Sequence, residues 1–355
     1  MQAQVVSESP LITIGERMNL ELGSFLKAQQ FESLLIVCDE NTHAHCYPLY
    51  AEIFAFFSNK SIVVLPAGDS EKNLHNSALI WEALLKLKGG RKSLVIALGG
   101  GMICDMCAFA ASVFMRGVSF ILLPTSLLAM VDASVGGKTA VNFNQLKNII
   151  GTFNNPEAVF IDVDFLKTLP HSEMDSGKAE MLKHSLLEGE QGFISFIENF
   201  NFSPSVERIA NSIRFKLKIT QHDFHEKGIR EILNLGHTTA HAFESLYFSK
   251  NKVLLHGHAV AAGLWIESFI SEGFFQNANK EKLQELRNFI SSNYARIEVS
   301  LSEADDLIEL MKSDKKNKSG STSFVLLTSP GNPLRDCFPD DLLIRQSIQN
   351  YISNA

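Results

Sequence analysis

The chain has 355 residues, of which 45% are hydrophobic and 20% are charged. This composition can bury a sizeable core and excludes a disordered chain, and the length predicts about two domains. The net charge of −7 excludes the strongly basic composition that is typical of nucleic-acid-binding proteins, so we expect no nucleic-acid partner.

The first half of the chain alternates short apolar runs with amphipathic ones. Strands are predicted where β-branched residues run into Gly, Pro or Asp, at Leu34–Cys38, Ile62–Leu65, Leu94–Leu98, Phe120–Leu123 and Val159–Ile161. A helix is predicted at Asn73–Lys88, where apolar residues recur at helical spacing. Strands separated by helices predict a largely parallel sheet.

Helical patterns dominate after Pro170. They cover residues 173–189, 205–222, 232–248, 259–273, 280–293 and 302–312, and one late strand is predicted at Phe324–Leu327. The sequence therefore predicts an α/β domain over residues 1–166, followed by a mainly α-helical domain over residues 167–355.

The sequence predicts neither secretion nor membrane insertion. Residues Met1–Pro10 contain no Lys or Arg and include Glu8, which is not typical of a secretory signal. The uncharged stretch between Arg116 and Asp132 contains only 15 residues and Pro124 interrupts it, whereas a membrane-spanning helix needs about 20 apolar residues. Five cysteines, an odd number, do not predict a disulfide framework. We therefore expect a soluble, cytoplasmic protein with no membrane partner.

A glycine-rich turn follows the third predicted strand. Leu94–Leu98 runs into Gly99-Gly100-Gly101, and a helix is predicted from Asp105. Glycines let a backbone approach a ligand closely, and a helix N-terminus favours a pyrophosphate. The turn is not the G-x-G-x-x-G fingerprint, so a plain tight turn remains an equal alternative. Asp39 and Asn41 follow the first predicted strand, where open α/β sheets hold polar ligand contacts, although Asp39 alone is better interpreted as a loop or cap residue.

Two other motifs are weaker than they look. Val135-Gly-Gly-Lys138-Thr139 resembles the end of a Walker A loop, but Asp132 stands where that loop needs Gly, so we reject an ATPase. Lys138, flanked by glycines, still suits a phosphate or carboxylate. Cys104-Asp-Met-Cys107 reads as C-x-x-C, but no second cysteine pair completes a zinc site, so packing against the sheet is the better interpretation.

Histidines form the strongest group of possible ligands. His237 and His241 are four residues apart and would share one helical face, with His256 and His258 downstream and Glu180 upstream. Imidazoles and a carboxylate from different helices would form a site suited to zinc. The spacing leaves open which three groups bind the metal.

Three basic residues, Lys183, Lys216 and Arg230, lie on the neighbouring helical segments. On spacing alone they are best interpreted as a solvated face, and a clamp for an anionic substrate is the alternative.

Taken together, the motifs resemble those of the 3-dehydroquinate synthase family over most of the chain. So many motifs in the same order argue against a chance resemblance. The matching segments are Asp39–Asn41, Pro66–Lys72, Gly99–Asp105, Met115–Gly117, Pro124–Asp132, Ser134–Thr139, Lys147-Asn148, Lys167–Pro170, Ala179–Lys183, Arg230–Thr238, His256-Gly257 and Asp314–Lys316.

The resemblance implies a dinucleotide-binding α/β domain and a helical metal-binding domain. It implies a carbon–oxygen lyase of the shikimate pathway, the route to aromatic amino acids. The reaction would convert 3-deoxy-D-arabino-heptulosonate 7-phosphate into 3-dehydroquinate and phosphate, with NAD used catalytically. Zinc, for which Co²⁺ could substitute, would be bound by Glu180, His237 and His256, and His241 would serve the substrate instead. The implied assembly is a homodimer in which Arg116 reaches the phosphate pocket of the neighbouring subunit.

The family's remaining site residues map onto two sets. The implied NAD contacts are Asp39, Asn41, Asp69, Lys72, Gly101, Met102, Ile103, Cys104, Asp105, Thr125, Ser126, Lys138, Lys147, Phe165, Leu166, Lys167 and Thr168. The implied substrate contacts are Asp132, Lys138, Asn148, Lys183, Lys216, Arg230, Asn234, His241 and a lysine of the Lys315-Lys316 pair, taken as Lys316.

Four positions depart from the family pattern without removing an implied ligand. Asp69 replaces a usual Glu, Cys104 a glycine, Ser126 a threonine and His258 a common Glu. The alternatives are a sibling sugar-phosphate cyclase, a zinc polyol dehydrogenase, or a non-catalytic descendant. The match at Lys216, Arg230, Asn234 and His241 argues against a sibling cyclase. A dehydrogenase would release NADH with each turnover, whereas a synthase would not. A non-catalytic descendant would be expected to have lost a ligand or a lysine clamp, and none is missing from the sequence.

Overall fold

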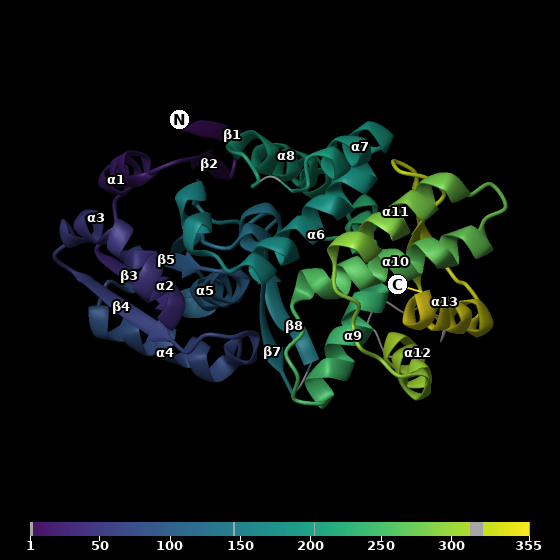
Figure 1. Cartoon of the computed structure of the whole chain (residues 1–355). Helices are drawn as coiled ribbons and strands as arrows, with labels where there is room; N and C mark the ends of the chain where they lie inside the picture. Colours follow the sequence, from purple (N-terminus) through teal and green to yellow (C-terminus); the bar gives the residue numbers. More distant parts are fainter. Residues whose placement is uncertain (1–2, 145, 202, 313–321, 355) are drawn as a thin grey trace. The chain divides into compact units, whose positions relative to one another are not determined.

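The computed structural model describes residues 3–144, 146–201, 203–312 and 322–354 (Figure 1). Lys315 and Lys316 lie outside the described residues. The chain forms two compact units, which are described separately below. The first unit comprises Met1–Met174 and Pro204–His225, and the second comprises Asp175–Ser203 and Glu226–Ala355.

A seven-stranded sheet forms the core of the first unit, in the order β1-β2-β9-β6-β5-β3-β4. Its strands pair in parallel except for β1 with β2. Every residue of β3 and β5 is buried, as expected for a parallel sheet covered on both faces. The strands are β1 (Gln4–Glu8), β2 (Leu11–Gly15), β3 (Ser33–Asp39), β4 (Lys60–Leu65), β5 (Ser93–Gly99), β6 (Ser119–Pro124) and β9 (Ala158–Asp162).

Helices and a separate hairpin complete the first unit. The hairpin pairs β7 (Lys138–Phe143) with β8 (Leu146–Phe153). The helices are α1 (Asn19–Ala28), α2 (Glu40–His45), α3 (Ala51–Ala55), α4 (Leu74–Leu87), α5 (Gly101–Val113) and α8 (Val206–His222). The short helical turns are η1 (Tyr47–Leu49), η2 (Asp69–Glu71), η3 (Gly90–Lys92), η4 (Phe114–Arg116), η5 (Ala129–Ala133) and η6 (Val163–Thr168).

The chain reverses its direction of winding at β3. It passes from β3 to β4 on one side and then to β5 on the other side of β3. Such a switch point leaves a crevice at the carboxyl ends of the two strands, which is where open α/β sheets bind ligands. The loops that follow β3 and β5 therefore lie at the expected ligand-binding edge.

The α/β prediction is confirmed, with one correction at this edge. All five predicted parallel strands are present, but α5 begins at Gly101, four residues before the predicted start at Asp105. Gly100 is extended, with φ −68° and ψ −172°, and acts as the N-cap. One residue therefore separates strand from helix, and the amide end of α5 lies directly beyond β5.

The second unit is mainly helical. Its helices are α6 (His171–Glu188, whose first turn belongs to the first unit), α7 (Glu190–Glu198), α9 (His237–Ser249), α10 (His256–Phe274), α11 (Lys280–Asn293), α12 (Ala304–Lys312) and α13 (Asp341–Asn354). The short turns η7 (Ile229–Asn234) and η8 (Leu301–Glu303) and the hairpin β10 (Phe324–Leu327)–β11 (Pro333–Cys337) complete it.

Helix α10 packs against α9, α11 and α13 and is buried along most of its length. Two helix predictions need correction around it. The helix predicted over residues 232–248 is two elements, η7 and α9, because Gly236 adopts a left-handed conformation with φ 80°. The helix predicted from residue 259 begins three residues earlier, at His256. Among the described helices, none is both long and apolar enough to span a bilayer.

Candidate active site

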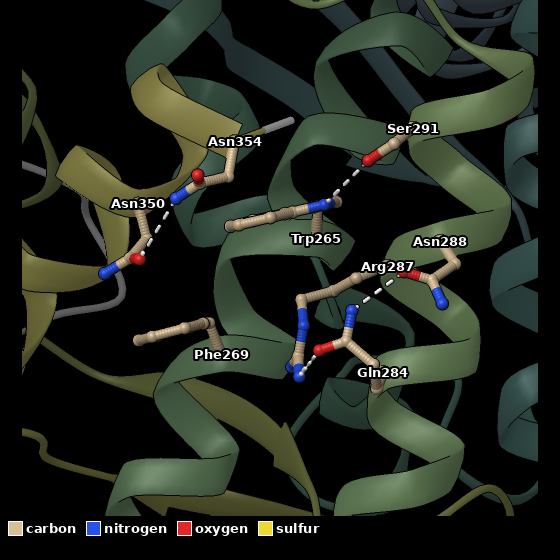
Figure 2. Close-up of a pocket in the computed structure, with 8 residues that line it drawn as sticks. All are labelled: Trp265, Phe269, Gln284, Arg287, Asn288, Ser291, Asn350 and Asn354. Atoms are coloured by element: carbon tan, nitrogen blue, oxygen red, sulfur yellow. Dashed lines mark hydrogen bonds between the residues drawn. The ribbon is translucent and has the colours of Figure 1, made fainter.

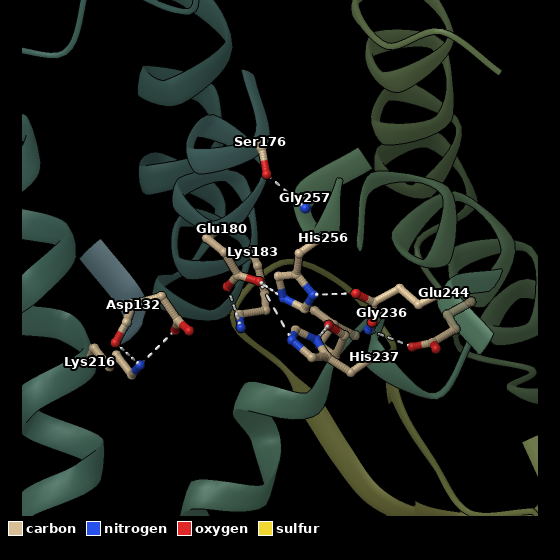
Figure 3. A network of polar contacts seen from close by, with 12 residues as sticks. Asp132, Ser176, Glu180, Lys183, Lys216, Gly236, His237, Glu244, His256 and Gly257 are labelled. Atoms are coloured by element: carbon tan, nitrogen blue, oxygen red, sulfur yellow. Dashed lines mark hydrogen bonds and ion pairs between the residues drawn. The ribbon is translucent and has the colours of Figure 1, made fainter. Parts of the chain in front are cut away.

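Three helices of the second unit bring a carboxylate and two imidazoles together (Figure 3). Glu180 lies on α6, His237 begins α9 and His256 begins α10. Oε1 of Glu180 is 3.5 Å from Nε2 of His237 and 3.3 Å from Nε2 of His256. The ligand atoms of the three residues lie within 4.8 Å of one another. Two imidazole nitrogens and one carboxylate oxygen are a donor set that suits a catalytic zinc ion, so the residues fit the implied metal.

Both imidazoles are oriented through their other ring nitrogen. Nδ1 of His237 is 3.1 Å from the carbonyl oxygen of Leu235, and Nδ1 of His256 is 3.4 Å from Oε1 of Glu244. Metal-binding histidines usually donate their second N–H to a carbonyl or a carboxylate in this way. Burial lowers the pKa of His256, but Glu244 and Glu180 outweigh it and raise the pKa to about 10. The two carboxylates therefore favour a positive charge at His256.

Glycines allow the ligand-bearing elements to approach closely. A Cβ at Gly257 would lie 1.9 Å from the carbonyl oxygen of Ser176, one turn before Glu180, and a Cβ at Gly263 would lie 1.9 Å from the carbonyl oxygen of Gly236. The amide of Gly257 also donates to Oγ of Ser176 at 2.9 Å. Backbone contact of this kind places the first residues of α9 and α10 beside α6.

The structure keeps His241 outside this set of ligand atoms. Its ring centroid is 5.6 Å from that of His237, yet among the described residues His241 belongs to no group of possible metal ligands, whereas Glu180, His237 and His256 form one. The structure therefore brings together the three residues that the resemblance implies as ligands. His258 instead packs edge-on against Tyr294, with centroids 6.0 Å apart.

The solvated-face interpretation of the basic residues is wrong. Lys183, Lys216 and Arg230 are only 2%, 6% and 2% exposed. Nζ of Lys183 is 2.5 Å from Oε2 of Glu180, and Nζ of Lys216 is 2.6 Å from Oδ1 of Asp132. Long cationic side chains are rarely this buried unless they are paired. The spacing could not show this because it does not say which helical face meets the core.

In the first unit, the implied substrate residues lie on η5, α8 and the hairpin. Asp132 belongs to η5, a π-helical turn, and such turns occur frequently at functional sites. Lys138 begins β7 and is exposed, and Asn148 lies on β8 with φ 53°. In the second unit, Asn234 closes η7 and its amide donates to Oε1 of Glu226 at 3.2 Å.

The implied NAD contacts follow the carboxyl ends of neighbouring parallel strands. The segments concerned are Asp39–Asn41 after β3, Asp69–Lys72 after β4, Gly101–Asp105 after β5, Thr125-Ser126 after β6 and Phe165–Thr168 after β9. Because parallel strands end at one edge of a sheet, these segments lie along the edge that contains the switch point.

Ion pairs and hydrogen bonds connect several of these residues. Nζ of the buried Lys72 lies 2.5 Å from Oδ2 of Asp105 and 2.5 Å from Oδ1 of Asn148. Nζ of Lys147 lies 2.9 Å from Oδ2 of Asp69. The sheet edge is therefore a connected polar surface.

Some of the implied NAD contacts also have structural roles. Asp39 caps α2, because its Oδ1 accepts from the amide of Thr42 at 2.8 Å. Phe165 is 2% exposed and packs against Tyr50. Cys104 and Cys107 are both buried, which confirms packing as the better interpretation of the C-x-x-C motif.

The sequence interpretation missed the acidic residues that surround the centre. Glu226 contacts Asn234, Glu244 contacts His256, and Glu267 accepts from the amides of Gly236 and Thr239 at 2.6 and 3.2 Å. Glu244 stands three residues after His241 and shares its face of the helix. That spacing does not show that Glu244 meets His256, which lies on a different helix.

A hollow of about 240 Å³ lies elsewhere in the second unit, between α10, α11 and α13 (Figure 2). Trp265 and Phe269 line it with amide side chains, and none of the predicted site residues does so. Its one charged group, Arg287, is 2.6 Å from Oε2 of Glu272. Nothing at this hollow points to the chemistry of the histidine centre.

Both units have the architecture of sugar-phosphate cyclases. A 2-deoxy-scyllo-inosose synthase, solved with carbaglucose-6-phosphate, NAD⁺ and Co²⁺, matches with a TM-score of 0.83 and 22% identity, over 96% of each chain. A 2-epi-5-epi-valiolone synthase from Streptomyces hygroscopicus subsp. jinggangensis, solved with NAD⁺ and Zn²⁺, matches with a TM-score of 0.84 and 21% identity, over 97% of each chain. At these identities the matches establish the fold alone.

Sequence comparison is more specific. The models of the 3-dehydroquinate synthase N-terminal and C-terminal domains match residues 62–176 and 177–317. The 3-dehydroquinate synthase of Parabacteroides distasonis is 42% identical over 328 residues, which are 90% of this chain and 92% of that protein. The chain belongs to the 3-dehydroquinate synthase family and is an enzyme of the cyclase and lyase type.

Proposed function

We propose that the chain is a 3-dehydroquinate synthase that converts 3-deoxy-D-arabino-heptulosonate 7-phosphate into 3-dehydroquinate and phosphate, with catalytic NAD and a divalent metal. The observation that carries this proposal is the meeting of Glu180, His237 and His256 beside the buried Lys183. Membership of the family, at 42% identity to a synthase over most of both chains, supports the same reaction.

The proposed cofactors fit the residues that would bind them. NAD would lie at the switch point, where the amide end of α5 favours a pyrophosphate. Zinc or cobalt would be held by Glu180, His237 and His256, and when bound it would polarise a substrate oxygen as a Lewis acid. Related cyclases solved with NAD⁺ and Co²⁺ or Zn²⁺ share the fold.

The chain's own basic residues would bind and orient the substrate. The substrate carries a carboxylate and a phosphate. These anionic groups would replace the acidic side chains that now pair with the cations, as Asp132 pairs with Lys216. Arg230 offers a planar fork that matches a carboxylate. Lys138 and Asn148 would bind phosphate, and His241 would hold or move a proton at a ring hydroxyl.

The substrate-facing positions favour this reaction over that of a sibling cyclase. Lys216, Arg230, Asn234 and His241 all match the dehydroquinate pattern, and Lys216 and Arg230 are buried. The test is phosphate release by purified enzyme supplied with the heptulosonate phosphate or a hexose 6-phosphate, with NAD stripped and restored. We expect release from the heptulosonate phosphate only, and only with NAD. Preference for the hexose phosphate would favour a sibling cyclase.

The proposal includes a homodimer. Arg116 is exposed in a turn where both it and Met115 have positive φ, 69° and 50°, a costly conformation that often marks functional positions. Exposed apolar side chains occur on α5, on η4 and on the hairpin, and the side-chain amide of Asn154, just after β8, donates to Oγ of Ser112 on α5 at 3.0 Å. We infer that they form one apolar patch of Val113, Met115, Phe143, Leu146, Ile149 and Phe153, each at least 40% exposed.

Apolar patches of this kind mark protein interfaces. We infer that a second copy covers the patch and that Arg116 contributes to the partner's phosphate site. A cytoplasmic location also belongs to the proposal, because the five cysteines are buried thiols without disulfides, as in reducing compartments.

A further inference from the structure

A buried carboxylate lies directly behind one of the proposed metal ligands. Glu244 is on α9, two turns after His237, and 4% of its side chain is exposed. Its Oε1 is 3.4 Å from Nδ1 of His256, and Nε2 of the same ring is 3.3 Å from Oε1 of Glu180. The imidazole of His256 therefore lies between two carboxylates from two other helices (Figure 3).

The position of Glu244 determines which ring nitrogen can bind a metal. A neutral imidazole has one N–H and one lone pair, and the tautomer follows from the hydrogen bond that the ring makes. A carboxylate at Nδ1 favours the tautomer with its proton on that nitrogen. The lone pair is then on Nε2, which faces Glu180 and is the nitrogen that completes the group of possible ligands.

The burial of Glu244 supports a specific role. An ionised carboxylate is costly to bury without a hydrogen-bonded or charged partner, so a buried Glu is rarely incidental. For His237 the backbone carbonyl of Leu235 takes the corresponding position at Nδ1, at 3.1 Å. With a carbonyl behind one imidazole and a carboxylate behind the other, Nε2 of each ring faces Oε1 of Glu180.

A second buried carboxylate, that of Glu267, connects α10 back to α9, as Glu244 connects α9 to α10. Glu267 on α10 is 1% exposed and accepts from the amides of Gly236 and Thr239 at the start of α9. Glu244 on α9 contacts the first residue of α10. Helices α9 and α10, which carry the two proposed histidine ligands, therefore each place a carboxylate at the first residues of the other.

We propose that Glu244 is a positioning residue of the metal centre, which acts through His256 by presenting Nε2 to the metal. This inference rests on the proposed metal site. It assigns Glu244 no contact with substrate or metal and predicts that the residue sets metal affinity and coordination.

The test is Co²⁺ binding to the metal-stripped full-length protein, followed by chelator competition and by the visible absorption spectrum of the bound ion. We expect Glu244→Ala to weaken Co²⁺ binding about 10- to 100-fold and to change the spectrum. Glu244→Gln keeps the shape and an oxygen that can accept from Nδ1–H, so it should lose less. Glu272→Gln is the matched control, because it removes a carboxylate of α10 that pairs with Arg287 instead, and it should bind Co²⁺ as the parent does.

Two results would overturn the inference. One is a Glu244→Ala protein that binds Co²⁺ with the parent's affinity and spectrum. The other is an equal loss in Glu244→Ala and Glu272→Gln, which would indicate general loosening of the helices. Failure of the proposed metal site would look different, because His256→Ala would then bind Co²⁺ as tightly as the parent.

Discussion

At the scale of single residues, burial distinguishes the three basic side chains of the proposed substrate site from ordinary surface lysines and arginines. Lys183, Lys216 and Arg230 are cations inside a chain of net charge −7, each at most 6% exposed. Removing one partner of a buried ion pair leaves the other charge uncompensated. Under the proposed function, an anionic substrate would supply the compensating charge when it displaces those partners.

His256 of α10 and His241 of α9 should respond differently to substitution. His256→Ala removes a proposed ligand and should abolish tight metal binding and turnover together. His241→Ala leaves Glu180, His237 and His256 in place, so it should retain the metal and lose about 100-fold or more in turnover, as for a lost proton-transfer group. Metal content after gel filtration, measured beside activity, checks this. A His241→Ala protein without metal, beside a metal-loaded His256→Ala protein, would reverse the ligand assignment.

At the scale of elements, the geometry of the centre depends on helices that meet at glycines. Gly257→Ala would place a Cβ 1.9 Å from the backbone oxygen of Ser176, which cannot move without α6. We expect a loss of about 1–3 kcal/mol in the free energy of unfolding and weaker metal binding, because Glu180 is on the next turn of α6. Thermal unfolding and metal titration measure the two effects.

The control for this substitution lies on the same helix. Gly273→Ala would meet only the end of the flexible Leu343 side chain, which can turn away. It should leave metal affinity unchanged. Equal effects of the two substitutions would show that the close approach at Gly257 does not position the ligands.

The end of α9 is connected to η8 by an acid-sensitive contact. A hydrogen bond from Lys250, with two more from the amide and hydroxyl of Ser300, lowers the pKa of Glu303 from 4.5 to about 2. A lowered folded-state pKa stabilises the protein above about pH 4.5, and that stabilisation is lost as the pH falls towards 2. Because the pair is partly exposed, the effect should stay below about 1 kcal/mol.

Urea unfolding of Glu303→Gln and parent at several pH values checks this contribution. The difference in stability between the two proteins should be present at pH 7 and shrink below pH 4.5. A difference that stays constant down to pH 3 would show that ionisation of Glu303 plays no part.

The elements that the sequence predicts best are those with a buried, regular pattern. All residues of β3 and β5 are buried, and their β-branched runs predicted them directly. The β7–β8 hairpin was not predicted, because Phe143, Leu146 and Ile149 are exposed and follow no alternation of buried and exposed faces. The break before α9 was missed because helical periodicity continues through Gly236, whose positive φ depends on the close packing of α10.

The site was predictable in part. Spacing alone indicated a metal centre but left its ligands open, and the resemblance to a family selected Glu180, His237 and His256. Glu244 was not predicted, because its role comes from packing between α9 and α10. Long-range contacts of this kind leave no periodic signal in the sequence.

At the scale of the whole molecule, Arg116 and the apolar patch predict a shared site. If Arg116 of one subunit completes the phosphate site of its partner, Arg116→Ala and Lys138→Ala should each inactivate a homodimer. A purified mixed dimer of the two variants would have one pocket with both lesions and one with neither. Its activity should return towards half of the parent's. A verified mixed dimer that stays inactive, or a parent that is monomeric at assay concentrations, would contradict the shared site.

The central claim is that the chain uses NAD catalytically in a cyclisation that releases phosphate. Its most direct test records phosphate release and NADH absorbance in the same reaction, with stripped enzyme, limiting NAD and the heptulosonate phosphate. The account predicts many phosphates released for each NAD, no accumulation of NADH, and no release without NAD. NADH that accumulates in step with product, or phosphate release that is unchanged without NAD, would contradict it.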